Sequence, residues 1–218
     1  EKETAEKAGV NYEDILAGKA CWVGEGEHIN SENAEVSLNG LSVEEAKNTV
    51  IDFLAKKNLT LRAIALTHLH VDHCLGCAEL SKATGLIPVI GLEDWLQRGM
   101  LIGKGMCFGM DLKPFQAEPL EEGEITWGSL NCKVIHTPGH SPGSLCYYFE
   151  DLGVLITGDL LFFRSVGRSD LPFGDGEGLV RSLREKIYTL PGATLVYPGH
   201  GPETSVSFEA VHNHFCRA

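Results

Sequence analysis

Four side chains that can bind a metal ion lie in one short segment of the 218-residue sequence. Residues 67–73 read T-H-L-H-V-D-H, which places three histidines and one aspartate within six positions. Imidazole nitrogens suit zinc, iron and other transition metals, and a carboxylate helps to neutralise the ion. The segment follows an apolar run at residues 63–66 that predicts a strand. We therefore expect a metal site at the end of a strand; a solvated polar turn is the alternative.

The same arrangement occurs three more times along the chain. In each case an apolar strand runs into a Gly- or Pro-rich turn that carries one histidine or aspartate, and glycine permits the tight backbone that such a turn needs. The ends of neighbouring strands converge, so four such loops can meet at one edge of a sheet. A tetrahedral ion needs only four ligands, so the full set predicts two adjacent ions, bridged by a carboxylate and a hydroxide. The candidate ligands are His68, His70, Asp72, His73, His140, Asp159 and His200.

Several other groups that could do chemistry have a simpler explanation. His136 ends a predicted strand and is expected to cap it or to support the site from outside. His212 and His214 lie near the C-terminus, where a solvated or locally packed end is expected. Cys74 and Cys77 have the C-x-x-C spacing of redox or metal motifs, but no thioredoxin-like strand and helix surround them. The simpler interpretation is that both cysteines are small residues at the start of a helix behind the metal loop.

Composition limits the partners and the compartment. The net charge is -12, which disfavours nucleic acid because phosphate binding depends on Lys and Arg. The sequence has no polybasic face and no apolar run near the ~20 residues that span a bilayer, so no membrane partner is expected. Residues 1–7 are charged and lack a signal-peptide core. The seven cysteines are odd in number and scattered, which is typical of reduced thiols in the cytoplasm.

The periodicity of apolar residues predicts one domain with alternating strands and helices. A capping box at Ser42 predicts a helix over residues 43–57, and a second helix is expected near 78–82. An apolar stripe from Leu179 to Leu190 predicts a third helix. Pro88 suggests that a strand at 86–90 lies at a sheet edge. Further strands are expected at residues 124–127, 130–135, 145–149, 154–156 and 194–197.

Residues 91–117 are rich in Gly and hold all three methionines together with several aromatic residues. One interpretation is a flexible apolar lid over a substrate pocket, because methionine adapts its shape readily. The other is a packing layer, because Met and Phe commonly fill protein cores. With a hydrophobic fraction of 43%, the chain has enough apolar residues for a sizeable core. Short strands, a few helices and ligands at strand ends together favour a layered α/β fold.

The H-x-H-x-D-H pattern of residues 68–73, followed in order by His140, Asp159 and His200, resembles the metallo-β-lactamase-fold hydrolases. Within that superfamily the chain is most similar to the short, single-domain glyoxalase II-like (hydroxyacylglutathione hydrolase-like) enzymes. The resemblance covers about residues 42–210 of the single domain expected over 1–218, and residues 1–40 match poorly. It implies an αββα sandwich with the metal site at one edge of the two sheets. The strings that carry it are residues 137–143, 158–162, 167–170 and 198–201.

The resemblance also implies a role for each ligand. His68, His70 and His140 would hold one divalent ion, Asp72, His73 and His200 would hold the other, and Asp159 would bridge them. Family members use zinc, and some use iron or manganese. The expected reaction is hydrolysis of a small-molecule thioester or ester by a hydroxide that the two ions generate, with Asp72 also orienting this nucleophile.

Three departures from the family bear on the substrate. Leu38-Asn39-Gly40 stands where the family has an Asp-x-Gly turn. Long glyoxalase II enzymes have a helical C-terminal region that helps to bind glutathione, whereas this chain ends soon after His200. Arg168 matches a glutathione-contacting basic position, but the nearby tyrosine is absent. Two alternatives are a persulfide dioxygenase-like enzyme with one iron and a lactonase or other ester hydrolase.

Overall fold

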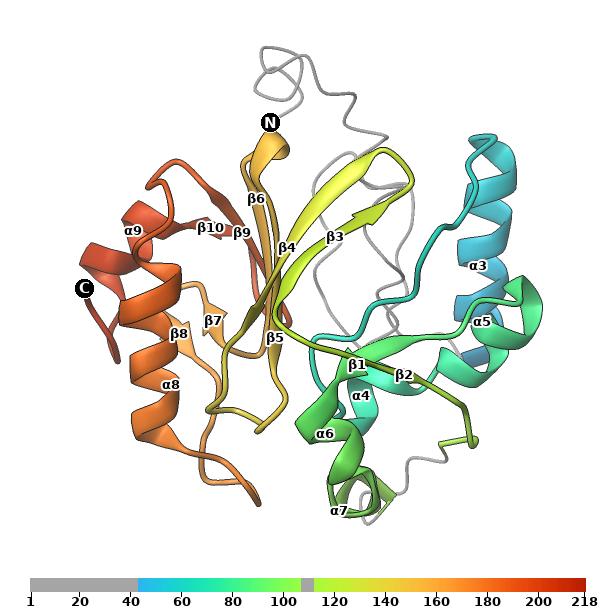
Figure 1. Ribbon diagram of the computed structural model, residues 1–218, viewed down its shortest axis with the longest axis horizontal. Helices are drawn as coiled ribbons and strands as arrows, with labels where there is room; N and C mark the ends of the chain where they lie inside the picture. Colours follow the sequence, from blue (N-terminus) through green and yellow to red (C-terminus); the bar gives the residue numbers. More distant parts are fainter. Residues whose placement is uncertain (1–42, 107–111) are drawn as a thin grey trace.

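A six-stranded mixed sheet lies at the centre of the computed structural model, which describes residues 43–106 and 112–218 (Figure 1). The central strands β5 (Leu145–Phe149) and β6 (Val154–Gly158) are buried along their whole length, because other layers cover both of their faces. β6 runs parallel to β9 (Leu195–Pro198), and the other neighbours in this sheet are antiparallel. The order across the sheet is β10 (Thr204–Ser205), β9, β6, β5, β4 (Leu130–His136) and β3 (Gly123–Trp127).

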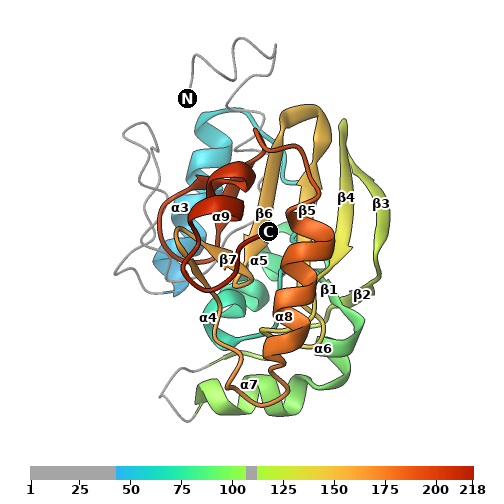
Figure 2. The same cartoon turned by 90° about the vertical axis from the view of Figure 1, so that its left-hand side faces the viewer.

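Two helices, α8 (Gly176–Ser182) and α9 (Val206–His212), lie over one face of this sheet (Figure 2). α8 continues as a π-helical turn at Leu183–Ile187. The apolar stripe predicted for this region is confirmed, because its first three members are almost fully buried against the sheet. These stripe residues are Leu179, Leu183 and Ile187.

A second layer faces the opposite side of the six-stranded sheet. It contains α3 (Val43–Lys56), α5 (Cys77–Thr84) and a small parallel sheet of β1 (Val89–Gly91) and β2 (Glu118–Leu120). Ala65 extends this sheet by a single bridge to Val89. Figure 1 shows the resulting order of helices, sheet, sheet and helices, which confirms the αββα sandwich. The predicted helices at 43–57 and 78–82 and the five predicted strands are present with small shifts at their ends.

Short helices, turns and strands connect the layers. Trp95 and Phe115 pack against the core of the second layer, so this part of residues 91–117 is a packing layer, as the second interpretation expected. None of the helices in the described parts of the chain is long and apolar enough to cross a membrane. The connecting elements are α4 (Val71–Cys74), α6 (Leu92–Leu96), α7 (Arg98–Met106), a 3₁₀ turn (Glu150–Leu152), β7 (Leu161–Phe162) and β8 (Ser165–Val166).

Two details of the sequence-based prediction are wrong. Residues 63–66 form one bridge rather than a full strand. Pro88 does not mark a sheet edge, because β1 is paired on both sides, and the missing N–H of Pro88 falls just before the strand. Cys74 and Cys77 are buried in the second layer, as the packing interpretation expected. The predicted cap at Ser42 and the turn at residues 38–40 lie outside the described residues.

Candidate metal centre

The His-rich segment forms a loop and the first turn of α4, at the edge where the two sheets meet. His70 is the N-cap of α4, and the backbone N–H of His73 donates to the carbonyl of His70 at 3.0 Å. This turn presents Asp72 and His73 on the same side as the preceding loop. His68 and His70 stand two residues apart in the loop before the helix. One short segment therefore presents four candidate ligands to the same space.

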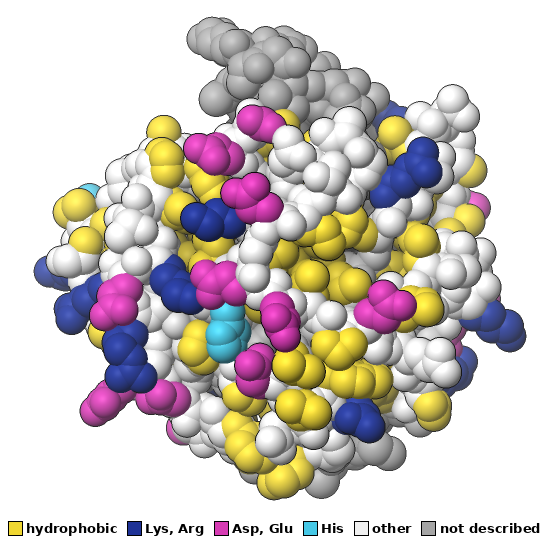
Figure 3. All heavy atoms as spheres, viewed as in Figure 1, with side chains coloured by type: hydrophobic (Ala, Val, Ile, Leu, Met, Phe, Trp, Pro, Cys, Tyr) yellow, Lys and Arg dark blue, Asp and Glu magenta, His cyan; other side chains and the backbone are white. Residues whose placement is uncertain are grey.

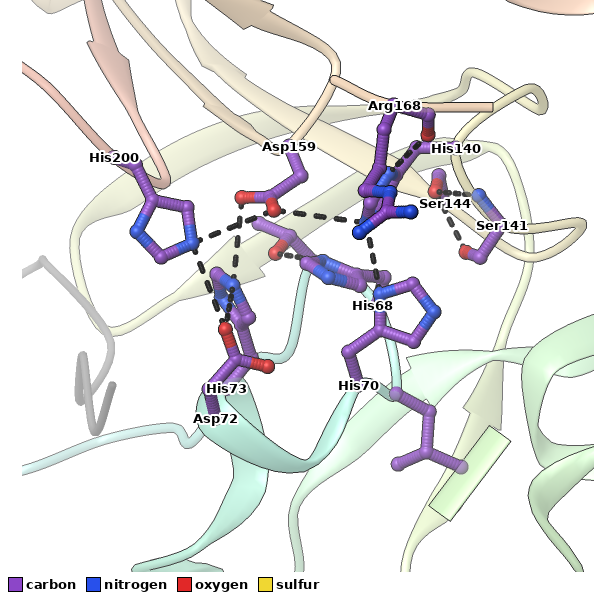
Figure 4. A network of polar contacts seen from close by, with 12 residues as sticks. His68, His70, Asp72, His73, His140, Ser141, Ser144, Asp159, Arg168 and His200 are labelled. Atoms are coloured by element: carbon purple, nitrogen blue, oxygen red, sulfur yellow. Dashed lines mark hydrogen bonds and ion pairs between the residues drawn. The ribbon is translucent and has the colours of Figure 1, made fainter. Parts of the chain in front are cut away.

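The other three candidate ligands come from the six-stranded sheet. His140 lies in the loop between β4 and β5, Asp159 follows β6, and His200 follows β9. Because β6 and β9 are parallel neighbours, their C-terminal ends lie side by side and bring Asp159 next to His200. Figure 4 shows the seven side chains directed at one common space, with Asp159 and His200 opposite the α4 segment.

Six of the seven side chains form two separate sets with metal-binding geometry, and a third set of His68, His73 and Asp159 links them. In the first set, which we call the His68 group (His68, His70 and His140), one ligand atom from each residue lies within 4.8 Å of the others. The same holds for the second set, which we call the Asp72 group (Asp72, His73 and His200). These are the two sets that the family resemblance implied.

Asp159 lies between the two groups. One carboxylate oxygen, Oδ2, is 3.5 Å from Nε2 of His140 and 3.4 Å from Nε2 of His200. The other oxygen, Oδ1, is 3.4 Å from Nε2 of His73. One carboxylate thus reaches a member of the His68 group and two members of the Asp72 group. This is the position that a bridging ligand would need.

Two glycines allow the backbone to approach Asp159 this closely. A Cβ atom added to Gly199 would come within 1.9 Å of Oδ1 of Asp159. A Cβ atom added to Gly167 would come within 1.7 Å of the Asp159 carbonyl oxygen. Gly199 is therefore needed for space beside the carboxylate of Asp159, and Gly167 for space beside its backbone carbonyl.

The hydrogen bonds of two histidines direct one ring nitrogen of each into the site. Nδ1 of His140 is 2.8 Å from the carbonyl of Arg168, to which it can only donate, and this bond directs Nε2 into the site, where it lies 2.8 Å from Nδ1 of His70. Nδ1 of His68 is 3.1 Å from the Thr67 hydroxyl. Nε2 of His68 is buried and makes no hydrogen bond with any described residue. A buried nitrogen of this kind is unfavourable unless something binds it. Together with the donor set, it shows that the His68 group fits a metal ion.

Electrostatics differ between the two groups. Burial, followed by the charge of His73, holds the pKa of His68 well below its usual value. Burial and then His140 lower the pKa of His70 to about 4. Contacts with Asp159 and then Asp72 raise the pKa of His200 to about 10. His68 and His70 are therefore neutral at pH 7 and ready to donate lone pairs, whereas His200 is tied to two carboxylates.

The carboxylates remain charged despite their burial. Burial opposes ionisation of Asp159, but the charge of His73 and contact with His200 hold its pKa well below the usual range. Burial also opposes ionisation of Asp72, and contact with His200 lowers its pKa. Two negative charges at the centre of five histidines provide the charge that a pair of divalent cations requires.

The site opens to solvent on one side. His68 is 1% exposed, whereas the side chain of His200 is 41% exposed and that of Asp72 is 28% exposed. Figure 3 draws the face seen in Figure 1, where a histidine lies among acidic and basic side chains near the middle, beside apolar side chains. A small molecule would therefore approach from the side of the Asp72 group.

The remaining predicted residues fall around the site. Arg168 contributes its backbone carbonyl to His140, while its exposed guanidinium pairs with Asp170 at 2.8 Å. Nε2 of His136 lies 2.7 Å from the carbonyl of Pro142, which makes it a support of the β4–β5 loop, as expected. His214, 2.7 Å from Arg164, lies at the exposed C-terminal end, as predicted.

Two residues near the site were not singled out from the sequence. The ring of Phe162 meets His200 edge to face at a centroid distance of 5.9 Å. Asp94 is fully buried and accepts hydrogen bonds from Leu69, in the loop of His68 and His70, and from Ser141, in the loop of His140. An aspartate in the first turn of a helix is common, so its sequence context gave no indication of this role.

The αββα sandwich and its histidine-rich edge define a class of protein, and comparison with known proteins identifies the family. The chain belongs to the metallo-beta-lactamase superfamily, whose family model matches residues 38–200. It is 42% identical over 168 residues to "Probable metallo-hydrolase YqgX" of Bacillus subtilis, covering 75% of this chain and 79% of that protein.

Two further relatives bear on function. "Hydroxyacylglutathione hydrolase GloC" of Haemophilus influenzae is 31% identical over 172 residues, covering 76% of this chain and 81% of that protein. A crystal structure of TTHA1623 in a di-iron-bound form superimposes with a TM-score of 0.71 at 35% identity, covering 81% of this chain and 86% of that one.

Proposed function

We propose that this protein is a hydrolase that uses two divalent metal ions to cleave a small-molecule thioester. The observation that carries the proposal is the position of Asp159 between two complete sets of ligands. A structural metal site is usually closed by four protein ligands, whereas seven ligands around two ions leave coordination positions for water and substrate. The similarity to proteins named metallo-hydrolase and hydroxyacylglutathione hydrolase supports the same reaction class.

The chemistry would be divided between the ions and the protein side chains. Two divalent ions, zinc or alternatively iron or manganese, would supply a hydroxide at neutral pH and a Lewis acid for the carbonyl oxygen of the substrate. The His68 group and the Asp72 group would hold one ion each, with Asp159 shared. Asp72 lies on the solvent side and would also orient the attacking nucleophile by accepting its proton in a hydrogen bond. A thiolate leaves readily, so the site needs no strong general acid.

Arg168 would bind an anionic part of the substrate. Its backbone is fixed to the metal site through His140, and its guanidinium is exposed beside that site (Figure 4). A guanidinium recognises carboxylates through two parallel hydrogen bonds, which Asp170 now accepts. A carboxylate of the substrate, such as one in a glutathione conjugate, would compete with Asp170 for these donors.

Metal analysis and hydrolysis assays on the purified protein test the proposal together. We expect about two ions per chain and cleavage of lactoylglutathione or of simpler thioesters. His70→Ala and Asp159→Ala should each abolish turnover and lower the metal content. Full activity in either variant would refute the ligand assignment. One iron per chain, with oxygen consumed on addition of a persulfide, would instead establish the dioxygenase alternative.

Substrate recognition is tested separately through Arg168. Arg168→Ala should raise KM for a carboxylate-bearing thioester, with little change in kcat, and should leave an uncharged thioester unaffected. Arg181→Ala provides a matched control, because Arg181 is similarly exposed and pairs with Asp175. Equal effects of the two variants on KM would contradict a specific role for Arg168.

A further inference from the structure

Asp94 joins the two loops that carry the His68 group. Its carboxylate is 0% exposed and accepts three hydrogen bonds. Oδ2 accepts from the backbone N–H of Leu69 at 2.8 Å and from the Ser141 hydroxyl at 2.9 Å, and Oδ1 accepts from the backbone N–H of Gly143 at 2.6 Å. Leu69 stands between His68 and His70.

We propose that Asp94 is a positioning residue that sets the separation of the two loops, and thereby the affinity of the His68 group for its ion. Leu69 holds the loop of His68 and His70 to one oxygen, while Ser141 directly follows His140 in the chain. No described hydrogen bond joins Asp94 to the Asp72 group. This inference rests on the metal sites of the proposed function and adds a residue that acts on only one of them.

Close packing around Asp94 leaves little freedom for the loops to shift. A Cβ atom added to Gly143 would lie 2.4 Å from the backbone nitrogen of Asp94 and 2.9 Å from Oδ1. A Cβ atom added to Gly91 would lie 1.9 Å from the carbonyl oxygen of Gly143. The start of α6 is therefore in backbone contact with the loop that carries His140. The carboxylate fills a fixed gap between the two loops.

The arrangement requires a carboxylate in particular. The backbone N–H groups of Leu69 and Gly143 can only donate, and each is bound to a different oxygen of Asp94. An asparagine has one oxygen and one NH₂ group, so it would place a donor against one of these N–H groups. Asp94→Asn thus changes few atoms but must move one loop relative to the other. Ser141→Ala removes only one donor and keeps both backbone bonds.

The test compares Asp94→Asn in two parent variants that each keep one metal group. His200→Ala disables the Asp72 group, and His70→Ala disables the His68 group. Zinc affinity is measured by competition with a chelator on metal-free protein, so the readout does not depend on turnover. In the His200→Ala parent, Asp94→Asn should weaken zinc binding by about 10–100-fold, as is typical when residues that support metal ligands are changed. In the His70→Ala parent the affinity should stay within about threefold.

Glu209→Gln is the matched control for general loss of packing. Glu209 is also a 0% exposed carboxylate with several hydrogen bonds, from the Arg164 N–H, the Thr204 hydroxyl and the Asn213 amide. The Glu209→Gln substitution should leave zinc affinity unchanged in both parent variants. If Asp94→Asn does not fold, Ser141→Ala in the His200→Ala parent should show a smaller loss in the same direction.

Three results would overturn the proposal. The first is unchanged zinc affinity of Asp94→Asn, or of Ser141→Ala where Asp94→Asn does not fold, in the His200→Ala parent. The second is an equal loss from Glu209→Gln, which would make the effect one of packing. The third is the absence of zinc binding in the His200→Ala parent itself, which would also refute the ligand grouping of the proposed function. Only this last result appears before Asp94 is changed. A failure of the proposed ligand grouping can therefore be distinguished from a failure of the role proposed for Asp94.

Discussion

Gly199→Ala should inactivate the protein while leaving it folded. The added Cβ would lie 1.9 Å from Oδ1 of Asp159, and real Cβ atoms essentially never approach closer than 3.0 Å. The added Cβ would also lie 2.9 Å from the carbonyl carbon of Gly158, so the backbone of Gly199 cannot relieve the clash by moving toward Gly158. The carboxylate must therefore move by about 1 Å. A displacement of about 1 Å at a catalytic site can reduce the rate by about 10²-fold, and overpacking of this kind costs about 1–3 kcal/mol of stability.

The assay combines kcat/KM on a thioester, metal content and thermal unfolding. Gly201→Ala is the control in the same loop: Gly201 has a φ of +84°, and an added Cβ would meet no atom within 4 Å among the described residues outside its chain neighbours. It should lose about 1–2 kcal/mol of stability from its left-handed backbone, yet keep its metal and most of its activity. A Gly199→Ala protein with normal metal content and normal kcat/KM would refute the argument from close approach.

Three further predictions concern the rest of the fold. Burial raises the pKa of both Cys132 and Cys146 to about 12, and since the thiolate is the reactive form, the higher pKa makes these thiols less reactive at any lower pH. Mass spectrometry should find neither alkylated by iodoacetamide in the folded protein at pH 8, and rapid labelling would contradict this. Phe173 follows Pro172 with a φ of 65°, in a turn closed by the N–H of Gly174 and the carbonyl of Leu171 at 2.9 Å, a position that favours glycine. Phe173→Gly should therefore raise the free energy of unfolding in urea by about 1 kcal/mol, and a decrease would show that the ring contributes more than the strain. Leu183→Ala, at a site 0% exposed, should cost about 2–5 kcal/mol, whereas Val211→Ala at 60% exposure should change the same quantity by less than about 0.5 kcal/mol.

The sequence was sufficient to find the candidate site because its ligands follow strands in a regular way. His140, Asp159 and His200 each stand in a Gly- or Pro-rich turn after an apolar strand, and β6 and β9 prove to be parallel neighbours. The strands β5 and β6 were recognisable because both are continuous apolar runs. Local pattern and position along the chain therefore carried most of the prediction.

What the sequence did not reveal depends on contacts between distant residues. Asp94 meets Ser141 and Gly143 across 47 and 49 positions of the chain, and no local pattern encodes such a contact. The one-bridge pairing of Ala65 with Val89 and the placement of Pro88 before a paired strand likewise depend on which segments lie side by side. Short-range periodicity cannot supply that information.

A crystal structure of the metal-loaded protein, with anomalous scattering recorded at the absorption edge of the bound metal, tests the central claim most directly. We expect two anomalous peaks. One should lie about 2.0–2.2 Å from the coordinating atoms of His68, His70 and His140, the other at the same distance from those of Asp72, His73 and His200, with Asp159 touching both. A single peak, or a second peak away from Asp72, His73 and His200, would contradict a two-metal hydrolase.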